Sequence, residues 1–177
     1  MELQKGRPTD LNGRLEKEIR VYDLLDRLDI EYFRVDHEAL FTMEACREVD
    51  RLLEVDMCKN LFLRNEQKTK HYLLLMPGDK KFKTKDLSKQ IGSARLSFAS
   101  AEDMERLLDI APGSVSVMGL MNDTTHQVQL VIDEEIFRCE YMACHPCVNT
   151  SSLKLKTEEI IHSFLPETGH IPIKVML

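Results

Sequence analysis

Hydrophobic residues near the start of the chain recur every three or four positions, at Leu15, Ile19, Tyr22, Leu25 and Leu28. This period predicts an amphipathic helix over Gly13–Asp29, and the apolar run after it predicts a strand over Glu31–Val35. The same helical spacing returns in MEACREVDRLL. A second helix is therefore expected there, with Thr42 as its N-cap.

Strand-like patterns dominate the middle of the chain. Met57–Arg64 and His71–Met76 flank the polar stretch NEQKTK and predict a β-hairpin. The elements expected after Pro77-Gly78 are helices over Thr84–Ile91, Ala101–Leu108 (capped by Ser100) and Thr157–Phe164, and strands over Val115–Leu120, Gln127–Ile132, Leu153–Leu155 and Ile171–Met176, with a short strand at Leu96–Phe98. Helices and strands that alternate around hairpins predict a mixed α/β fold, and we expect residues 1–177 to form one domain.

Composition excludes several classes of protein. With 177 residues, 43% hydrophobic and 31% charged, the chain suits a compact globular domain. No apolar run approaches the roughly 20 residues of a membrane span, and the start MELQKGRPTD lacks the features of a secretory signal. Five cysteines, an odd number, fit a reducing compartment better than a disulfide framework. We therefore expect a cytoplasmic protein without a membrane partner.

Charge is unevenly distributed along the sequence. The formal net charge of -6 argues against a protein that coats DNA by bulk charge. From Arg64 to Arg95, however, nine Lys and Arg stand against three acidic residues, a local balance of +6 that leaves -12 elsewhere. Such a segment either contacts a few phosphates of an anionic polymer or is a solvated surface.

Cys144-His145-Pro146-Cys147 has the C-x-x-C spacing of thiol redox sites. The residues that follow, VNTSSLKLK, look extended, whereas such a site needs its first cysteine at a helix N-terminus. No second C-x-x-C completes a zinc site, so neither redox catalysis nor a metal is favoured. The sequence also lacks G-x-S-x-G, Walker, G-x-G-x-x-G and H-E-x-x-H motifs.

Two segments are candidates for chemistry. In the strand from Met57, Lys59 shares a face with Leu61 and Leu63, so it points toward the core if they do. A lysine there needs an anionic partner such as a phosphate or an oxyanion, although it can also extend past the strand end to solvent. In the second segment, Gly119 among strand-like residues indicates either a close approach of a ligand or a bulge.

Several ordered blocks together resemble the freestanding prolyl-tRNA editing proteins, the YbaK and prolyl-tRNA-synthetase-associated domain family. The blocks are CKNLFLRN from Cys58, KHYLL, RLSFAS from Arg95, PGSVSVMGLMND from Pro112, VIDEEI from Val131 and HPCVNTSSLKL from His145, with the looser VDHEALFTMEA from Val35. They extend over nearly the whole chain. The resemblance implies a mixed, partly barrel-like β-sheet wrapped by helices.

The resemblance also implies an activity, namely hydrolysis of the ester between a wrongly attached amino acid and tRNA, with alanine on proline tRNA as the expected substrate. Lys59 and His145 match the catalytic residues of the family. The residues matching its substrate pocket are Asn60, Ser116, Gly119 and Asn149, and Met118 beside the glycine is expected to limit its size. The expected partners are the 3′ end of aminoacyl-tRNA and prolyl-tRNA synthetase, with no cofactor, and Lys80, Lys81 and Lys83 are expected to contact tRNA.

One position departs from the family pattern. Val117 stands where the family usually has proline, which affects the expected shape of the pocket. Two alternatives therefore stay open at this stage. One is a noncatalytic tRNA- or synthetase-binding module of the same fold. The other is a thiol-dependent protein that uses Cys144 and Cys147.

Overall fold

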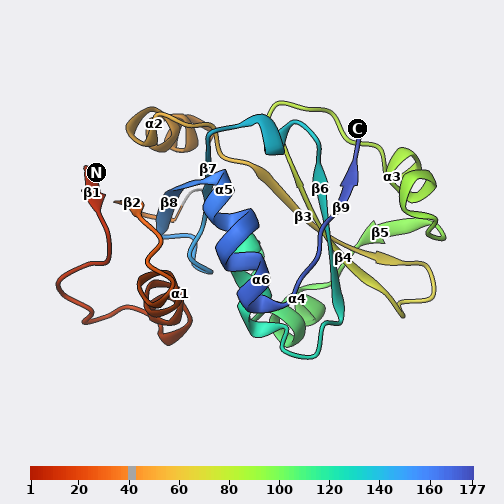
Figure 1. The fold of residues 1–177 in the computed structure, drawn as a ribbon, viewed down its shortest axis with the longest axis horizontal. Coiled ribbons are helices and arrows are strands. Elements are labelled where there is room, and N and C mark those ends of the chain that lie inside the picture. The colour runs from red at the N-terminus through yellow and green to blue at the C-terminus, as the bar shows by residue number, and fades with distance from the viewer. Residues whose placement is uncertain (40–42) are drawn as a thin grey trace.

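The structure, a computed structural model, describes residues 1–39 and 43–177, and the expected cap Thr42 lies outside this range. Two β-sheets lie side by side, with helices between and around them (Figure 1). The helical elements are α1 (Glu16–Arg27), α2 (Met43–Leu53), α3 (Thr84–Ile91), α4 (Ala101–Leu108), the 3₁₀ helices η1 (Val117–Asn122) and η2 (Ile136–Arg138), and the consecutive turns α5 (Thr157–Glu159), the π-helical η3 (Ile160–Phe164) and α6 (Leu165–Thr168). None of the described helices is long and apolar enough to cross a bilayer.

The strands form a four-stranded and a five-stranded sheet, so the mixed α/β prediction is confirmed. The four-stranded sheet has the order β1-β2-β8-β7, and its strands are β1 (Leu3–Lys5), β2 (Tyr32–Asp36), β7 (Tyr141–Cys144) and β8 (Ser151–Lys156). The five-stranded sheet has the order β5-β3-β4-β6-β9, and its strands are β3 (Lys59–Asn65), β4 (His71–Met76), β5 (Leu96–Phe98), β6 (Val128–Asp133) and β9 (Ile173–Val175). The single, partly barrel-like sheet expected from the resemblance is replaced by these two sheets.

Local patterns predicted most elements to within a few residues. The largest difference concerns Val115–Leu120, expected as a strand, because residues 117–122 form η1 instead. Ser116 lies before this helix, and its hydroxyl accepts a hydrogen bond from the Met118 amide at 3.1 Å. Short polar side chains favour such caps over a strand. Strands β1 and β7, which are only three and four residues long, were also not predicted from the sequence.

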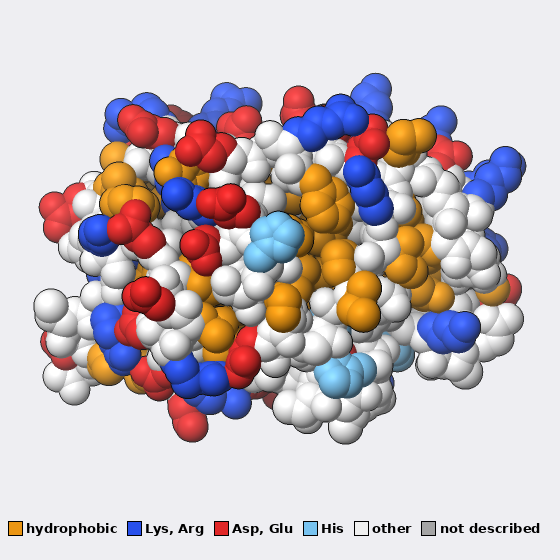
Figure 2. Space-filling model, viewed as in Figure 1, with side chains coloured by type: hydrophobic (Ala, Val, Ile, Leu, Met, Phe, Trp, Pro, Cys, Tyr) orange, Lys and Arg blue, Asp and Glu red, His pale blue; other side chains and the backbone are white. Residues whose placement is uncertain are grey.

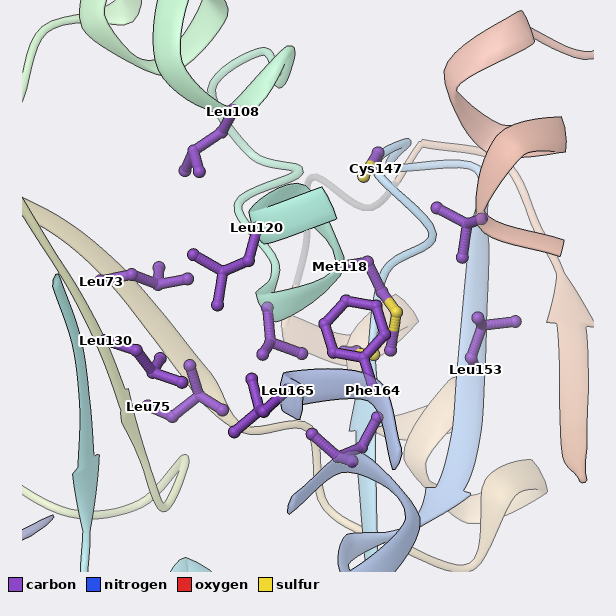
Figure 3. Packing of buried hydrophobic residues seen from close by; sticks show 14 of the residues in the cluster. Leu73, Leu75, Leu108, Met118, Leu120, Leu130, Cys147, Leu153, Phe164 and Leu165 are labelled. Carbon is purple, nitrogen blue, oxygen red and sulfur yellow. The ribbon is translucent and has the colours of Figure 1, made fainter. Parts of the chain in front are cut away.

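The main hydrophobic core lies between the two sheets. Figure 3 shows Leu73, Leu75 and Leu130 of the five-stranded sheet facing η1 and the α5–α6 helix, with Leu153 of β8 beyond them. Each sheet also has a second covered face. Leu63, Leu74 and Val131 face a separate cluster that includes Leu87 of α3. Strand β3 is therefore buried on both sides beyond its first residues.

The outer face of the four-stranded sheet is covered by α2. Val49 and Leu53 of this helix pack with Val35 of β2 and Ala143 of β7, and Met57 lies at the border of the same cluster. All of these side chains except Met57 are fully buried. Helix α2 therefore marks the face of the sheet opposite to the main core.

Gly119 is a glycine because of packing within the main core. A Cβ atom built on it lies 2.5 Å from Ile110 Cδ1, closer than real Cβ atoms come to other atoms, and 3.1 Å from Leu108 Cβ, which is also a tight contact. The missing side chain lets η1 pack directly against the end of α4. The sequence signal of a close approach at Gly119 is thereby explained by a contact within the protein.

We expect Gly119→Ala to lower the free energy of unfolding by about 1–3 kcal/mol, because overpacking a dense core forces its neighbours to shift. Ile110→Val removes the nearest methyl group, so the double variant should regain part of this loss relative to Ile110→Val alone. Urea denaturation of the four proteins measures the coupling. Additive losses would contradict the assigned contact.

Candidate functional site

The two residues predicted to be catalytic lie where the two sheets meet. Met57, just before β3, forms a parallel backbone bridge with Ala143 of β7. Lys59 follows Met57 by two residues, and His145 follows Ala143 by two residues. Because the two segments run parallel from the bridge, they carry Lys59 and His145 in the same direction from one shared point.

Both side chains belong to the face covered by α2. Along each segment, alternate residues face opposite sides. Met57 and Ala143 pack with the cluster under α2, whereas Cys58 and Cys144 pack with the main core. By the same alternation, Lys59 and His145 emerge on the α2 face. Both side chains are half-buried, which leaves them accessible to a ligand.

The Lys59 ammonium group is held by the loop after β4. Its Nζ donates a hydrogen bond to the Lys80 carbonyl oxygen at 2.5 Å. Gly78 of this loop lies so close to the bridge that a Cβ atom on it would be 2.5 Å from the Met57 carbonyl oxygen. The loop can therefore reach Lys59 only with glycine at this position.

The side chain of Lys80 has a structural role, and its contact with tRNA stays a prediction. Its Nζ lies 2.9 Å from Asp133 Oδ2 and 2.7 Å from Glu135 Oε1. The Asp133 carboxylate is fully buried and also accepts hydrogen bonds from the backbone amides of Glu135 and Leu177. Lys80 thus fixes the loop that holds Lys59, while Lys81 and Lys83 are exposed and remain predicted tRNA contacts.

His145 has one ring nitrogen bound within the protein. Its Nδ1 lies 2.8 Å from the Ser151 carbonyl oxygen, which can only accept, so Nδ1 carries the proton. Burial lowers the pKa of His145, the bond to Ser151 opposes this shift, and nearby His37 adds to it. At neutral pH the ring is therefore uncharged, and Nε2 carries a lone pair that no described residue engages.

Two neighbours of His145, His37 and Ser152, were not predicted from the sequence. The His37 ring lies 6.2 Å from the His145 ring, and the Ser152 hydroxyl contacts both. Burial also lowers the pKa of His37. The antiparallel register of β2 with β8, which pairs Val35 with Ser152, brings them together. His37 lies in the loosest of the resembling blocks, and that position was the only available signal.

The remaining predicted pocket residues support the site from the core side. Asn60 Oδ1 accepts a hydrogen bond from the Val117 amide at 3.2 Å, a bond that proline at position 117 could not donate. The departure from the family pattern therefore comes with a link between β3 and η1. Ser116, Met118 and Gly119 are fully buried, as Figure 3 shows for Met118. The contacts give them a packing role, and their contact with substrate stays a prediction.

Asn149 lies in the loop between β7 and β8, and its side chain is half-buried. A Cβ atom on Gly113 would lie 3.5 Å from its Nδ2. The loop after His145 therefore reaches the segment that leads into η1. The role of Asn149 in substrate binding stays a prediction.

The two thiols of the C-x-x-C motif are buried and protonated, which makes them unreactive. Cys144 and Cys147 are unpaired and about 0% and 1% exposed. Burial raises the pKa of Cys147 to about 12 and raises that of Cys144 still further, so both stay protonated. No group of three or more His, Cys, Asp or Glu within residues 1–39 and 43–177 is arranged to hold a metal ion. These observations argue against the thiol-dependent alternative.

Two cavities among the described residues lie away from Lys59 and His145. One of about 810 Å³ opens beside the tip of the β3–β4 hairpin and the start of β6, and one of about 580 Å³ lies between α1 and the residues around His126.

The surface charge is uneven. On the face shown in Figure 2, basic side chains outnumber acidic ones at the end that carries α3 and the β3–β4 hairpin. The other half of this face mixes acidic and basic side chains.

Comparison with known proteins assigns the chain to a family. Residues 37–162 match the aminoacyl-tRNA editing domain. The chain belongs to this family. It is 36% identical over 137 residues to the prolyl-tRNA editing protein ProX of Acetoanaerobium sticklandii, an alignment covering 77% of this chain and 83% of ProX. The resemblance predicted from the sequence is thereby confirmed.

Further relatives of this editing domain occur in animals and among solved structures. The present chain is 31% identical to the prolyl-tRNA synthetase associated domain-containing protein 1 of Xenopus laevis, in an alignment that covers 91% of this chain and 96% of that protein. A crystal structure of a candidate trans-editing enzyme for prolyl tRNA synthetase has a TM-score of 0.65 at 15% identity, covering 92% of this chain and 98% of the other. This structural likeness confirms the fold.

In this editing domain, we expect Lys80→Met to lower the free energy of unfolding by about 2–4 kcal/mol, because it leaves the buried Asp133 carboxylate without its cation. Lys81→Met makes the same chemical change at an exposed neighbour and should alter stability by no more than about 0.5 kcal/mol. Urea unfolding measures both. Equal effects of the two substitutions would show that the ion pair does not hold the loop.

Proposed function

We propose that this protein is an aminoacyl-tRNA deacylase that acts in trans on mischarged proline tRNA. In this reaction, water attacks the carbonyl carbon of the ester between the amino acid and the terminal ribose. The carbon–oxygen bond to the ribose breaks, which releases the free amino acid and tRNA with its 3′ end restored. The observation that carries the proposal is the convergence of Lys59 and His145 at the bridge between the sheets in a member of the editing family.

Lys59 supplies positive charge at this point. Within residues 1–39 and 43–177, the half-buried Lys59 ammonium group has one hydrogen-bond partner, the Lys80 carbonyl oxygen. Two further N–H donors are then available for a phosphate or for the oxyanion that forms at the ester carbonyl. The loop fixed by Lys80 and Gly78 keeps the ammonium group in place before the substrate arrives. Such preorganised charge stabilises a developing oxyanion without a metal.

His145 supplies an acceptor at the same point. Because Nδ1 is bound to the Ser151 carbonyl, Nε2 can accept a hydrogen bond from the substrate or from the attacking water. We assign His145 to orienting these groups. Asn60 and Ser116 hold η1 behind the site, and Gly119 lets η1 pack against α4.

Alanine is the amino acid that we propose is removed from proline tRNA, because a small pocket would exclude larger amino acids. A synthetase site that accepts proline rejects the smaller alanine poorly, since removing one or two methylene groups changes binding by about 1–3 kcal/mol. A second site that is too small for proline then hydrolyses the error. The proposed partners are the aminoacylated 3′ end of tRNA and prolyl-tRNA synthetase. We place this activity in the cytoplasm and assign it to residues 1–177 as a single domain.

The decisive assay compares alanyl-, cysteinyl- and prolyl-charged proline tRNA as substrates. We expect the wild-type protein to deacylate the alanyl form fastest. Lys59→Ala should lower this rate by about a hundredfold or more, because it removes a preorganised charge, and should leave the melting temperature unchanged. Lys5→Ala, at an exposed lysine of β1, is the matched control and should keep full activity. A wild-type protein that binds these tRNAs and hydrolyses none would favour the noncatalytic module.

Lys81 and Lys83 are proposed to contact the tRNA backbone. The double charge reversal Lys81→Glu and Lys83→Glu should raise the KM for alanyl-tRNA several-fold at low salt and flatten its dependence on salt. Arg27→Glu with Arg138→Glu gives the same change in net charge at exposed surface ion pairs and serves as the control. If both double variants change KM equally, the segment is only a solvated surface.

A further inference from the structure

His37 and Ser152 form a hydrogen-bonded connection behind His145. The His37 Nε2 atom lies 2.9 Å from the Ser152 Oγ atom, which lies 3.4 Å from His145 Nδ1. Ser152 is fully buried, so bulk water does not compete for its hydroxyl group. The connection joins the end of β2 to the loop after β7 through β8.

The partners of the two histidines determine where the protons lie. His37 Nδ1 is 2.8 Å from the Glu38 carbonyl oxygen, and His145 Nδ1 is 2.8 Å from the Ser151 carbonyl oxygen. A carbonyl oxygen only accepts, so both Nδ1 atoms are protonated. In the uncharged rings, each Nε2 then carries a lone pair. His37 Nε2 must therefore accept the hydrogen bond that Ser152 donates.

This arrangement leaves Ser152 unable to donate to His145. A serine hydroxyl has a single proton, and here that proton faces His37. The oxygen turns a lone pair toward His145 Nδ1, in agreement with a proton on that atom. Without an acceptor at position 37, the hydroxyl would be free to rotate and donate to His145 Nδ1. It would then stabilise the opposite tautomer, with the proton on Nε2.

We propose that His37 and Ser152 are positioning residues that keep His145 in the Nδ1–H tautomer, with its Nε2 facing the site as a hydrogen-bond acceptor. Neither residue needs to touch the substrate. The tautomer itself is a property of the protein alone, and its consequence for turnover rests on the proposed deacylase function. His37 removes a competing donor, while the Ser151 carbonyl supplies the direct bond.

The test reads the His145 tautomer by ¹⁵N NMR of the ring nitrogens in the substrate-free, full-length protein. In the wild type at pH 7.5, we expect a protonated Nδ1 and an unprotonated Nε2. His37→Phe removes the acceptor and should give a measurable population of the opposite tautomer. His37→Gln keeps an acceptor oxygen and should retain the wild-type signature. Melting temperatures identify any variant that fails to fold.

A double variant separates this role from general packing. In His37→Phe with Ser152→Ala, the competing hydroxyl is gone, so His145 should return to the wild-type tautomer although a second side chain has been lost. On alanyl-tRNA, His37→Phe should lower kcat about five- to tenfold with KM unchanged, and both His37→Gln and the double variant should regain most of the rate.

Three results would overturn the proposal: an unaltered tautomer in His37→Phe, a shift that Ser152→Ala does not suppress, or a shifted tautomer with unchanged kcat. Failure of the deacylase function looks different, because the wild-type protein would then be inactive on every charged tRNA. The NMR comparison would still decide the positioning role in that case.

Discussion

The candidate site depends on one backbone constraint, the parallel bridge between Met57 and Ala143. This bridge connects β7 of the four-stranded sheet to the segment just before β3 of the five-stranded sheet. Two residues that are 86 positions apart in the sequence are thereby carried onto the same face. The close approach of Gly78 to the Met57 carbonyl brings the loop after β4 to the same point. A shift of the bridge by one residue would turn Lys59 toward the opposite face.

Around this constraint, several groups that attract attention in the sequence serve the scaffold. Lys80 neutralises a buried carboxylate, Gly119 permits helix packing, and the thiols of Cys144 and Cys147 fill the main core. The groups that we propose for the chemistry are the Lys59 ammonium and His145 Nε2. This number suffices for an activated ester, because hydrolysis needs an oriented water molecule and a stabilised oxyanion. A net negative charge with one basic segment is compatible with a tRNA substrate if the protein binds only its aminoacylated 3′ end.

Sequence periodicity predicted the elements whose pattern is local. The helical stripe of α1 and the β3–β4 hairpin lie close to their expected bounds because burial on one face sets the pattern. Periodicity gave the wrong element at η1. There the Ser116 hydroxyl and the Asn60 side chain, which is distant in the sequence, accept hydrogen bonds from backbone amides of η1, and strand-like residues form a helix. The family resemblance indicated Lys59 and His145 as candidate site residues but gave no role to His37, since its position beside His145 depends on the register between β2 and β8. Long-range pairing of this kind leaves no trace in a single sequence.

The most direct measurement is a crystal structure with a non-hydrolysable analogue, in which an amide replaces the ester between alanine and the ribose of adenosine. We predict that the analogue binds on the face covered by α2, with its amide carbonyl oxygen accepting a hydrogen bond from Lys59 Nζ and a ribose hydroxyl group donating one to His145 Nε2. An analogue seated instead in the 810 Å³ cavity beside the hairpin tip, away from both residues, would contradict it.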